Sequence, residues 1–237
     1  MSLLYLVRHG QADRLGKNYD RLTKHGIFQA KKLGEYFLNQ RIEFDSVYTG
    51  TLNRQKETAM GILEAFQTER FCIPDPIENS GWDEFESRLW LGLAAKIRNA
   101  NEGFANLYDL YKKAWENGEE STRTHFQSMI QIVLKDWVEG VWDPVEPYTF
   151  SEYVEKVSFA PKSIPKDLKS TLVLSSSTPI AVMMGLSCQM KYQNYPVFMK
   201  SITNTSLSVF RRSRDFWEPV SFNTTPHLTD PDWITIV

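Results

Sequence analysis

Polar residues suited to chemistry on an anionic group follow several short apolar segments of this sequence. Arg8 and His9 come directly after the apolar segment 3–7, and Arg54 lies shortly after a second such segment, 44–48. Guanidinium groups bind doubly charged anions such as phosphomonoesters through paired hydrogen bonds. A neutral imidazole beside them can attack phosphorus as a nucleophile, and the nearby positive charge favours that neutral form.

An acid and a set of hydroxyl groups follow two further segments. Glu84 lies after an extended, proline-containing stretch, and we favour it as the proton donor to a leaving oxygen. The neighbouring alternatives are Glu78, Asp83 and Glu86. Residues 175–178 supply hydroxyl and backbone N–H groups after the apolar segment 171–174. Ligands of open α/β sheets bind at the carboxyl ends of the strands, so we expect all these groups to converge at one edge.

The elements that must position these residues alternate between strands and helices. Thr23 suits the N-cap of a first helix, a second helix is expected over 52–66, and Pro179 suits the first turn of a third. Strands are predicted over 3–7, 44–48, 171–174, 206–210 and 217–222, with an edge strand or an irregular tail over 233–237. This order predicts a three-layer αβα sandwich with a mostly parallel sheet.

Residues 86–165 show a different pattern. Aromatic and aliphatic residues recur at helical spacing from Phe104 to Trp115 and again from Phe126 to Trp137. We interpret this segment as a helical insertion, or cap, within a single domain over 1–237. Its aromatic residues are expected mainly in the core. The alternatives are that they line a substrate cage or form a dimer or partner interface.

Composition and charge limit the class of protein. The chain has 237 residues, of which 27 are Lys or Arg and 29 are Asp or Glu, so its net charge is −2. That balance gives no electrostatic reason to expect nucleic acid or an anionic membrane as a partner. Four His and two distant Cys show no zinc-ligand spacing, so no metal is expected.

Location is predicted from the apolar runs and the cysteines. No segment reaches the roughly 20 apolar residues of a membrane span, and the first apolar run is shorter than that of a signal peptide. Cys72 and Cys188 are expected to be buried thiols in a reducing compartment. These features predict a cytoplasmic protein.

The residues above resemble the signature of the histidine phosphatase superfamily, the phosphoglycerate-mutase-like proteins. The clearest likeness is Leu6-Val7-Arg8-His9-Gly10-Gln11-Ala12. Further similar segments follow in the family's order at 22–33, 44–59, 81–85, 204–207 and 222–228. A lone Arg-His-Gly is a weak signal, whereas the signature and these further matches in the same order are strong. The insertion matches little of the family pattern.

The resemblance implies a role for each candidate residue. His9 would be the phosphorylated nucleophile, Arg8 and Arg54 would hold the phosphoryl oxygens, and Glu84 would be the general acid. The further candidates for phosphate or substrate contact are Gln11, Asn18, Ser176, Ser177 and His227. Family members need no metal or organic cofactor, so none is implied here.

One position departs from the family pattern. Members typically carry a second catalytic His in a Ser-His-Gly segment after the strand that corresponds to 171–174. With Pro179 as the anchor, that His falls on Ser176 and the following Gly on Ser177. Removing one transition-state donor costs roughly 10²–10³ in rate in acyl transfer. Three alternatives follow: a slow enzyme, a site completed by His227, or a fold that binds phosphorylated ligands without turnover.

We therefore expect a phosphomonoester hydrolase that works through a phosphohistidine, of low activity if the second His is not replaced. Its partner would be a phosphorylated small molecule. The alternative is a catalytically impaired relative that binds a phosphorylated metabolite or protein. A mutase is less favoured, because returning the phosphoryl group to substrate requires an intact site that excludes water.

Overall fold

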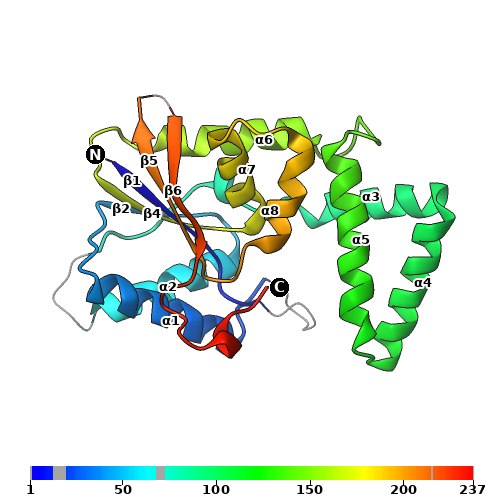
Figure 1. Cartoon of the computed structure of the whole chain (residues 1–237), viewed down its shortest axis with the longest axis horizontal. Helices are drawn as coiled ribbons and strands as arrows, with labels where there is room; N and C mark the ends of the chain where they lie inside the picture. The colour runs from blue at the N-terminus through cyan, green and yellow to red at the C-terminus, as the bar shows by residue number, and fades with distance from the viewer. Residues whose placement is uncertain (1, 13–19, 68–72, 215, 237) are drawn as a thin grey trace. The chain divides into compact units, whose positions relative to one another are not determined.

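Figure 1 shows the computed structural model of the chain, which describes residues 2–12, 20–67, 73–214 and 216–236. Asn18 and Cys72 lie outside the described residues. The chain divides into two compact units. The first comprises residues 1–84, 156–190 and 197–237, and the second comprises residues 85–155 and 191–196. Every candidate site residue that the structure describes belongs to the first unit. A single domain with an insertion over 86–165 remains our proposal.

The first unit contains a six-stranded sheet in the order β3-β2-β4-β1-β5-β6. The strands are β1 (Leu3–Arg8), β2 (Ser46–Thr49), β3 (Ile77–Glu78), β4 (Ser170–Ser175), β5 (Leu207–Ser213) and β6 (Phe216–Thr224). Strands β1 to β4 are parallel, whereas β5 is antiparallel to β1 and β6 to β5. The prediction of a mostly parallel sheet is therefore confirmed, and the carboxyl ends of β1, β2 and β4 lie at one edge.

Helices cover both faces of this sheet (Figure 1). Helices α1 (Lys24–Asn39) and α2 (Asn53–Gln67) pack together on one face, and α7 (Ser177–Ser187) lies on the other. Thr23 is the N-cap of α1 as predicted, and its side chain accepts a hydrogen bond from Gly26 N. Buried residues of the sheet, Val7, Val47 and Leu172 among them, pack against apolar residues of α1 and α2. Their packing fixes the helices and so the polar residues at the helix ends.

The second unit is helical, as the spacing of its aromatic residues predicts. It contains α3 (Ser87–Ala100), α4 (Glu102–Asn117), α5 (Ser121–Val138) and the first residues of α6 (Phe150–Phe159). Gly118 ends α4 with a φ of +68°, a left-handed conformation that glycine adopts without strain. Tyr111 packs against Phe126 with ring centroids 5.7 Å apart. The aromatic residues thus form contacts within the unit, although Trp115 is 47% exposed.

Several local expectations differ from the structure. The loop expected over 175–178 is shorter, because β4 continues through Ser175 and α7 already begins at Ser177. The end of the chain follows the irregular-tail alternative: a 3-10 turn, η4 (Pro231–Trp233), precedes residues 234–236, which are in no strand. Helix α8 (Tyr195–Ser201) and the 3-10 turns η1 (Ser80–Trp82), η2 (Ala160–Ser163) and η3 (Tyr192–Asn194) are not predicted from the sequence.

Two further observations concern the features from which the cellular location is predicted. The prediction of a buried Cys188 is wrong: the residue caps the C-terminus of α7, beyond its buried part, and its thiol is free and exposed. Within the described parts of the chain, no helix combines the length and apolar character needed to cross a bilayer.

Candidate active site

The backbone of the loop after β1 is held by hydrogen bonds from three directions. His9 N donates to Ser175 O of the neighbouring strand over 2.9 Å, and Asn204 Nδ2 donates to His9 O over 3.1 Å. Gly10 N donates to Thr58 Oγ1 of α2 over 3.0 Å. A Cβ atom on Gly10 would lie 2.5 Å from Gly26 O, so only glycine allows the loop to cross the first turn of α1 this closely. The backbone on either side of the imidazole is therefore fixed.

The ring of His9 has an assignable tautomer. Its Nδ1 lies 2.8 Å from Gly10 O, and because a carbonyl oxygen only accepts, Nδ1 carries the proton. Its Nε2 accepts a hydrogen bond from Arg54 Nε over 3.2 Å. The lone pair of the buried imidazole is therefore on Nε2 and is directed toward the guanidinium. This is the orientation that a nucleophilic imidazole requires.

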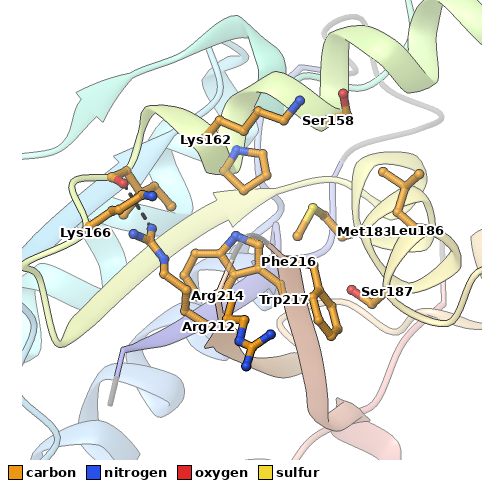
Figure 2. Close-up of a pocket in the computed structure, with 12 residues that line it drawn as sticks. Ser158, Lys162, Lys166, Met183, Leu186, Ser187, Arg212, Arg214, Phe216 and Trp217 are labelled. Carbon is orange, nitrogen blue, oxygen red and sulfur yellow. Dashed lines mark hydrogen bonds between the residues drawn. The ribbon is translucent and has the colours of Figure 1, made fainter.

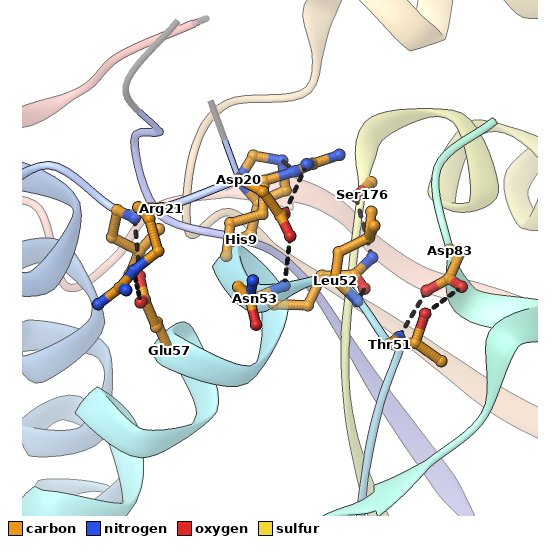
Figure 3. A network of polar contacts seen from close by, with 12 residues as sticks. His9, Asp20, Arg21, Thr51, Leu52, Asn53, Glu57, Asp83 and Ser176 are labelled. Atoms are coloured by element: carbon orange, nitrogen blue, oxygen red, sulfur yellow. Dashed lines mark hydrogen bonds and ion pairs between the residues drawn. The ribbon is translucent and has the colours of Figure 1, made fainter. Parts of the chain in front are cut away.

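Arg54 is buried in the first turn of α2 and is held by a second contact. Its Nη1 forms an ion pair with Asp20 Oδ1 over 2.9 Å, and the other carboxylate oxygen accepts from Asn53 N over 2.9 Å. Figure 3 shows this network with His9 above the start of α2. Asp20 thus joins the helix N-terminus to the guanidinium.

Arg8 ends β1 with a buried side chain. Its Nη1 donates to Ile202 O, and its backbone carbonyl accepts from Thr205 N over 3.0 Å. The structure therefore brings the buried Arg54 guanidinium to the ring of His9, whereas the buried Arg8 guanidinium donates to the backbone of Ile202.

The contacts of the carboxylates distinguish Glu84 from its neighbours. Glu84 Oε2 accepts from Ser177 Oγ over 3.2 Å and from Thr178 N over 3.3 Å, at the N-terminus of α7. Asp83 instead binds the backbone and the hydroxyl of Thr51 over 2.6 and 2.7 Å. The exposed Glu78 pairs with Lys56, and Glu86 pairs with Arg88. The contacts of Glu84 thus place it at the start of α7, the helix that follows β4.

The two candidate serines differ in their surroundings. Ser176 is fully buried, and its Oγ accepts from Gln55 Nε2 over 3.0 Å. Gln55 also donates to Trp82 O over 2.9 Å, so it ties the start of α7 to the segment before Glu84. Ser177 donates to Glu84, as described above.

The remaining candidates contact structural partners. Gln11 Oε1 accepts from Thr23 Oγ1 over 2.8 Å, which places its amide at the cap of α1. His227 Nε2 lies 2.9 Å from Thr205 Oγ1, and burial lowers the pKa of this His to about 4. The hydroxyl of Thr205 is already donated to Asn204 O over 2.8 Å, so His227 Nε2 is the donor of the neutral ring. Asn18 is not among the described residues.

Sequence reasoning missed several residues that hold the site. They are Asp20, Gln55, Thr58 and Asn204. Thr58 lies four residues after Arg54 and so on the same face of α2, a signal that was available. Asp20 gave no such signal, because only the tertiary structure brings it to α2.

Comparison with known proteins decides the family. The family model of the histidine phosphatase superfamily (branch 1) matches residues 4–143, more than half of the chain. The chain belongs to the histidine phosphatase superfamily. The matched residues of this superfamily member include Arg8, His9, Arg54 and Glu84. Their individual roles are proposals.

Curated relatives are similar to this histidine phosphatase superfamily member over a shorter stretch of its chain. A 2,3-bisphosphoglycerate-dependent phosphoglycerate mutase of Lactobacillus acidophilus is 33% identical over 81 residues, which are 32% of this chain and 34% of that protein. The enzyme of the same name from Azorhizobium caulinodans is 35% identical over 68 residues, 26% of this chain and 33% of that protein. The matched stretch spans about a third of these relatives.

Solved structures share the fold over nearly the whole chain. Phosphoserine phosphatase of Entamoeba histolytica, in complex with 3-phosphoglyceric acid, has a TM-score of 0.63 at 20% identity and covers 96% of this chain and 100% of its own. YhfR of Bacillus stearothermophilus has a TM-score of 0.65 at 16% identity, with the same coverages. Phosphoglycerate mutase of Bacillus anthracis has a TM-score of 0.60 at 15% identity and covers 96% and 95%. At these identities the likeness establishes the fold.

Proposed function

We propose that this protein is a phosphomonoester hydrolase that forms a phosphohistidine on His9. The observation that carries the proposal is the orientation of the imidazole. Nδ1 donates to Gly10 O, so the lone pair lies on Nε2, beside Arg54 Nε. A phosphoryl group that approaches Nε2 meets a positive charge, which offsets the negative charge of its oxygens.

The proposed reaction has two steps. In the first, Nε2 of His9 forms a bond to phosphorus while the ester P–O bond breaks, and protonated Glu84 gives its proton to the leaving oxygen. In the second, water attacks phosphorus and loses a proton to the Glu84 carboxylate, and the P–N bond breaks to release phosphate. Arg8 and Arg54 bind the transferring oxygens in both steps. These groups require no cofactor.

Arg54 must exchange a partner for this reaction. Its Nη1 is paired with Asp20, whose carboxylate is 31% exposed, and its Nε is bonded to His9. We propose that the incoming phosphoryl group takes over the Nε donor, while Asp20 continues to hold Nη1. The guanidinium then keeps its place through catalysis, which reduces the entropic cost of organising the site.

Turnover of 4-nitrophenyl phosphate tests this proposal. We expect hydrolysis by the wild type, loss of hydrolysis in His9→Ala, and a phosphoenzyme that is labile in acid and stable in base, as a phosphoramidate is. Turnover that survives His9→Ala would contradict the mechanism. A buried polar control, Ser46→Ala on β2, leaves the proposed groups in place.

A second candidate function is binding without turnover. We propose that Ser176 stands where family members carry their second catalytic His, and its hydroxyl is already engaged by Gln55. Vanadate binding by calorimetry, with no turnover of aryl or alkyl phosphates, would favour this candidate. A gain of orders of magnitude in Ser176→His would favour the hydrolase. Conversion of 3-phosphoglycerate to 2-phosphoglycerate would identify a mutase instead.

We also propose that the protein works in the cytoplasm. The exposed free thiol of Cys188 suits a reducing compartment, where thiols persist without forming disulfides. Cell fractionation against a cytoplasmic marker enzyme tests this location, and recovery of the protein outside that fraction would contradict it.

A further inference from the structure

A groove with a cavity volume of about 440 Å³ lies in the first unit, away from the candidate active site. Figure 2 shows its walls, which come from three parts of the chain: residues 158–166, the second half of α7, and the β5–β6 hairpin. Pockets for small molecules typically enclose about 300–1,000 Å³, so this volume suits a small ligand.

The groove is separate from the candidate active site. Its hairpin wall begins where Arg211 pairs with Leu3, at the opposite end of β1 from Arg8. Five residues of extended chain span about 16 Å. Likewise, Leu186 in the groove lies about 12 Å along α7 from Thr178, which contacts Glu84. A ligand here would therefore not reach His9.

Arg212 is a fixed cation in this groove. Its guanidinium lies 4.6 Å from the ring centroid of Trp217, and it donates to Ile164 O over 3.0 Å and to Pro165 O over 3.4 Å. Burial lowers the pKa of this side chain. These neutral partners orient the guanidinium without compensating its charge.

Two exposed cations extend the positive charge. Lys162 lies with its Nζ 4.5 Å from the ring centroid of Phe159, and Arg214 follows β5 at the hairpin turn. No ion pair joins Lys162, Arg212 or Arg214 to a carboxylate among the residues that the structure describes. Lys166 lies in the same wall. An anion is the ligand that this charge favours.

The other surfaces of the groove are apolar. Trp217 and Met183 are buried in its wall, whereas Phe216 is 52% exposed and Leu186 is 38% exposed. Exposed apolar side chains beside these cations match a ligand with an apolar body and an anionic group. Inorganic phosphate alone would leave the apolar surface in water.

We propose that this groove is a second binding site, for a small amphipathic anion: a sulfonate, carboxylate or phosphate attached to an aromatic or alkyl body. The anionic group would bind the Arg212 guanidinium, Lys162 and Arg214 would attract it electrostatically from the rim of the groove, and the apolar body would cover Phe216 and Leu186. The assignment does not depend on the reaction proposed for His9.

Binding of 8-anilinonaphthalene-1-sulfonate, followed by its fluorescence, tests the site. Two matched probes separate the contributions: N-phenyl-1-naphthylamine has the same rings without the sulfonate, and sulfate has the charge without the rings. We expect the sulfonate dye to bind to one saturable site and to bind at least threefold more tightly than either matched probe.

Charge-removing variants locate the site. Lys162→Gln/Arg214→Gln changes two exposed side chains and is expected to raise the dissociation constant at least threefold, with an unchanged thermal midpoint. Arg211→Gln is the control, because Arg211 is on the same strand but pairs with Glu218. Phe216→Ser tests the apolar half of the groove independently and is also expected to raise the dissociation constant of the dye.

Three results would overturn the proposal. The first is an affinity that neither the double variant nor Phe216→Ser changes. The second is a loss of affinity in Arg211→Gln that equals the loss in the double variant. The third is a loss of dye affinity in Arg54→Gln that the groove variants do not show. Such a loss would place the dye at the candidate active site.

Discussion

Arg54 Nε donates to His9 Nε2 over 3.2 Å, while the other nitrogen of the same ring donates to Gly10 O. The two contacts fix both the tautomer and the direction of the lone pair. Because Asp20 holds the far end of the guanidinium, the arginine is itself positioned before any ligand arrives. His9 and Arg54, the proposed nucleophile and cation, are thus held in place by contacts within the protein.

Replacing Arg54 with Lys tests whether this geometry matters for catalysis. Lysine keeps the charge, but it lacks the planar donor pair that binds His9 and Asp20 together. We expect kcat on 4-nitrophenyl phosphate to fall roughly 10²–10³-fold, the scale for losing one transition-state donor. Arg21→Lys is the control, because Arg21 is an exposed partner of Glu57. Equal rates for Arg54→Lys and the wild type would contradict a role for the guanidinium geometry.

Glu84→Gln tests the proposed proton donor. An aryl leaving group departs without a proton, whereas an alkyl oxygen needs one, so the loss should depend on the substrate. We expect kcat to fall about 10²–10⁴-fold on an alkyl phosphate and much less on 4-nitrophenyl phosphate. Glu78→Gln, which removes an exposed partner of Lys56, should leave both rates unchanged. A uniform loss on both substrates would argue for a structural role of Glu84.

His227 makes stability depend on pH. Burial lowers its pKa from 6.5 to about 4, so below pH 6.5 the unfolded state binds a proton that the folded state does not. Above pH 6.5 the folded protein keeps the full free energy of unfolding at this residue. That free energy decreases as the pH falls toward 4. At pH 5 we expect a loss of about 2 kcal/mol in the free energy of unfolding from this residue.

Urea unfolding at pH 7 and pH 5 measures this effect, with His227→Gln as the matched variant. Gln cannot titrate, but it can still donate to Thr205, so its stability should fall less over the same range. The difference between the two proteins removes the contribution of the other titrating groups. Identical pH dependences would contradict a buried, neutral His227 in the folded protein.

Chelation tests the proposed cofactor-free chemistry. We assign charge neutralisation to Arg8 and Arg54, and no cluster of three or more His, Cys, Asp or Glu suited to a metal lies within the described residues. We expect the rate on 4-nitrophenyl phosphate to stay within about twofold after EDTA treatment and after added Mg²⁺. A rate that EDTA abolishes and Mg²⁺ restores would require a metal in the mechanism.

Much of the fold could be predicted from local patterns. The apolar run that ends at Arg8, the Thr23 cap and the helical spacing from Phe104 to Trp115 each report a short-range property of the chain. Hydrogen bonds within a turn and the periodicity of a buried face act over a few residues. They are therefore visible in the sequence.

The positions of the catalytic candidates relative to one another depend on tertiary contacts. Asp20 reaches Arg54 from a different segment, and Asn204 reaches the His9 carbonyl across 195 positions of the chain. Burial is equally non-local: it isolates His227, whereas Cys188 is exposed at the end of a helix whose first half is buried. The groove beside Arg212 also requires three distant segments to meet. Local sequence therefore identified the strand ends that carry the candidate residues, and packing alone decided which side chains meet, because contact and desolvation are properties of the assembled chain.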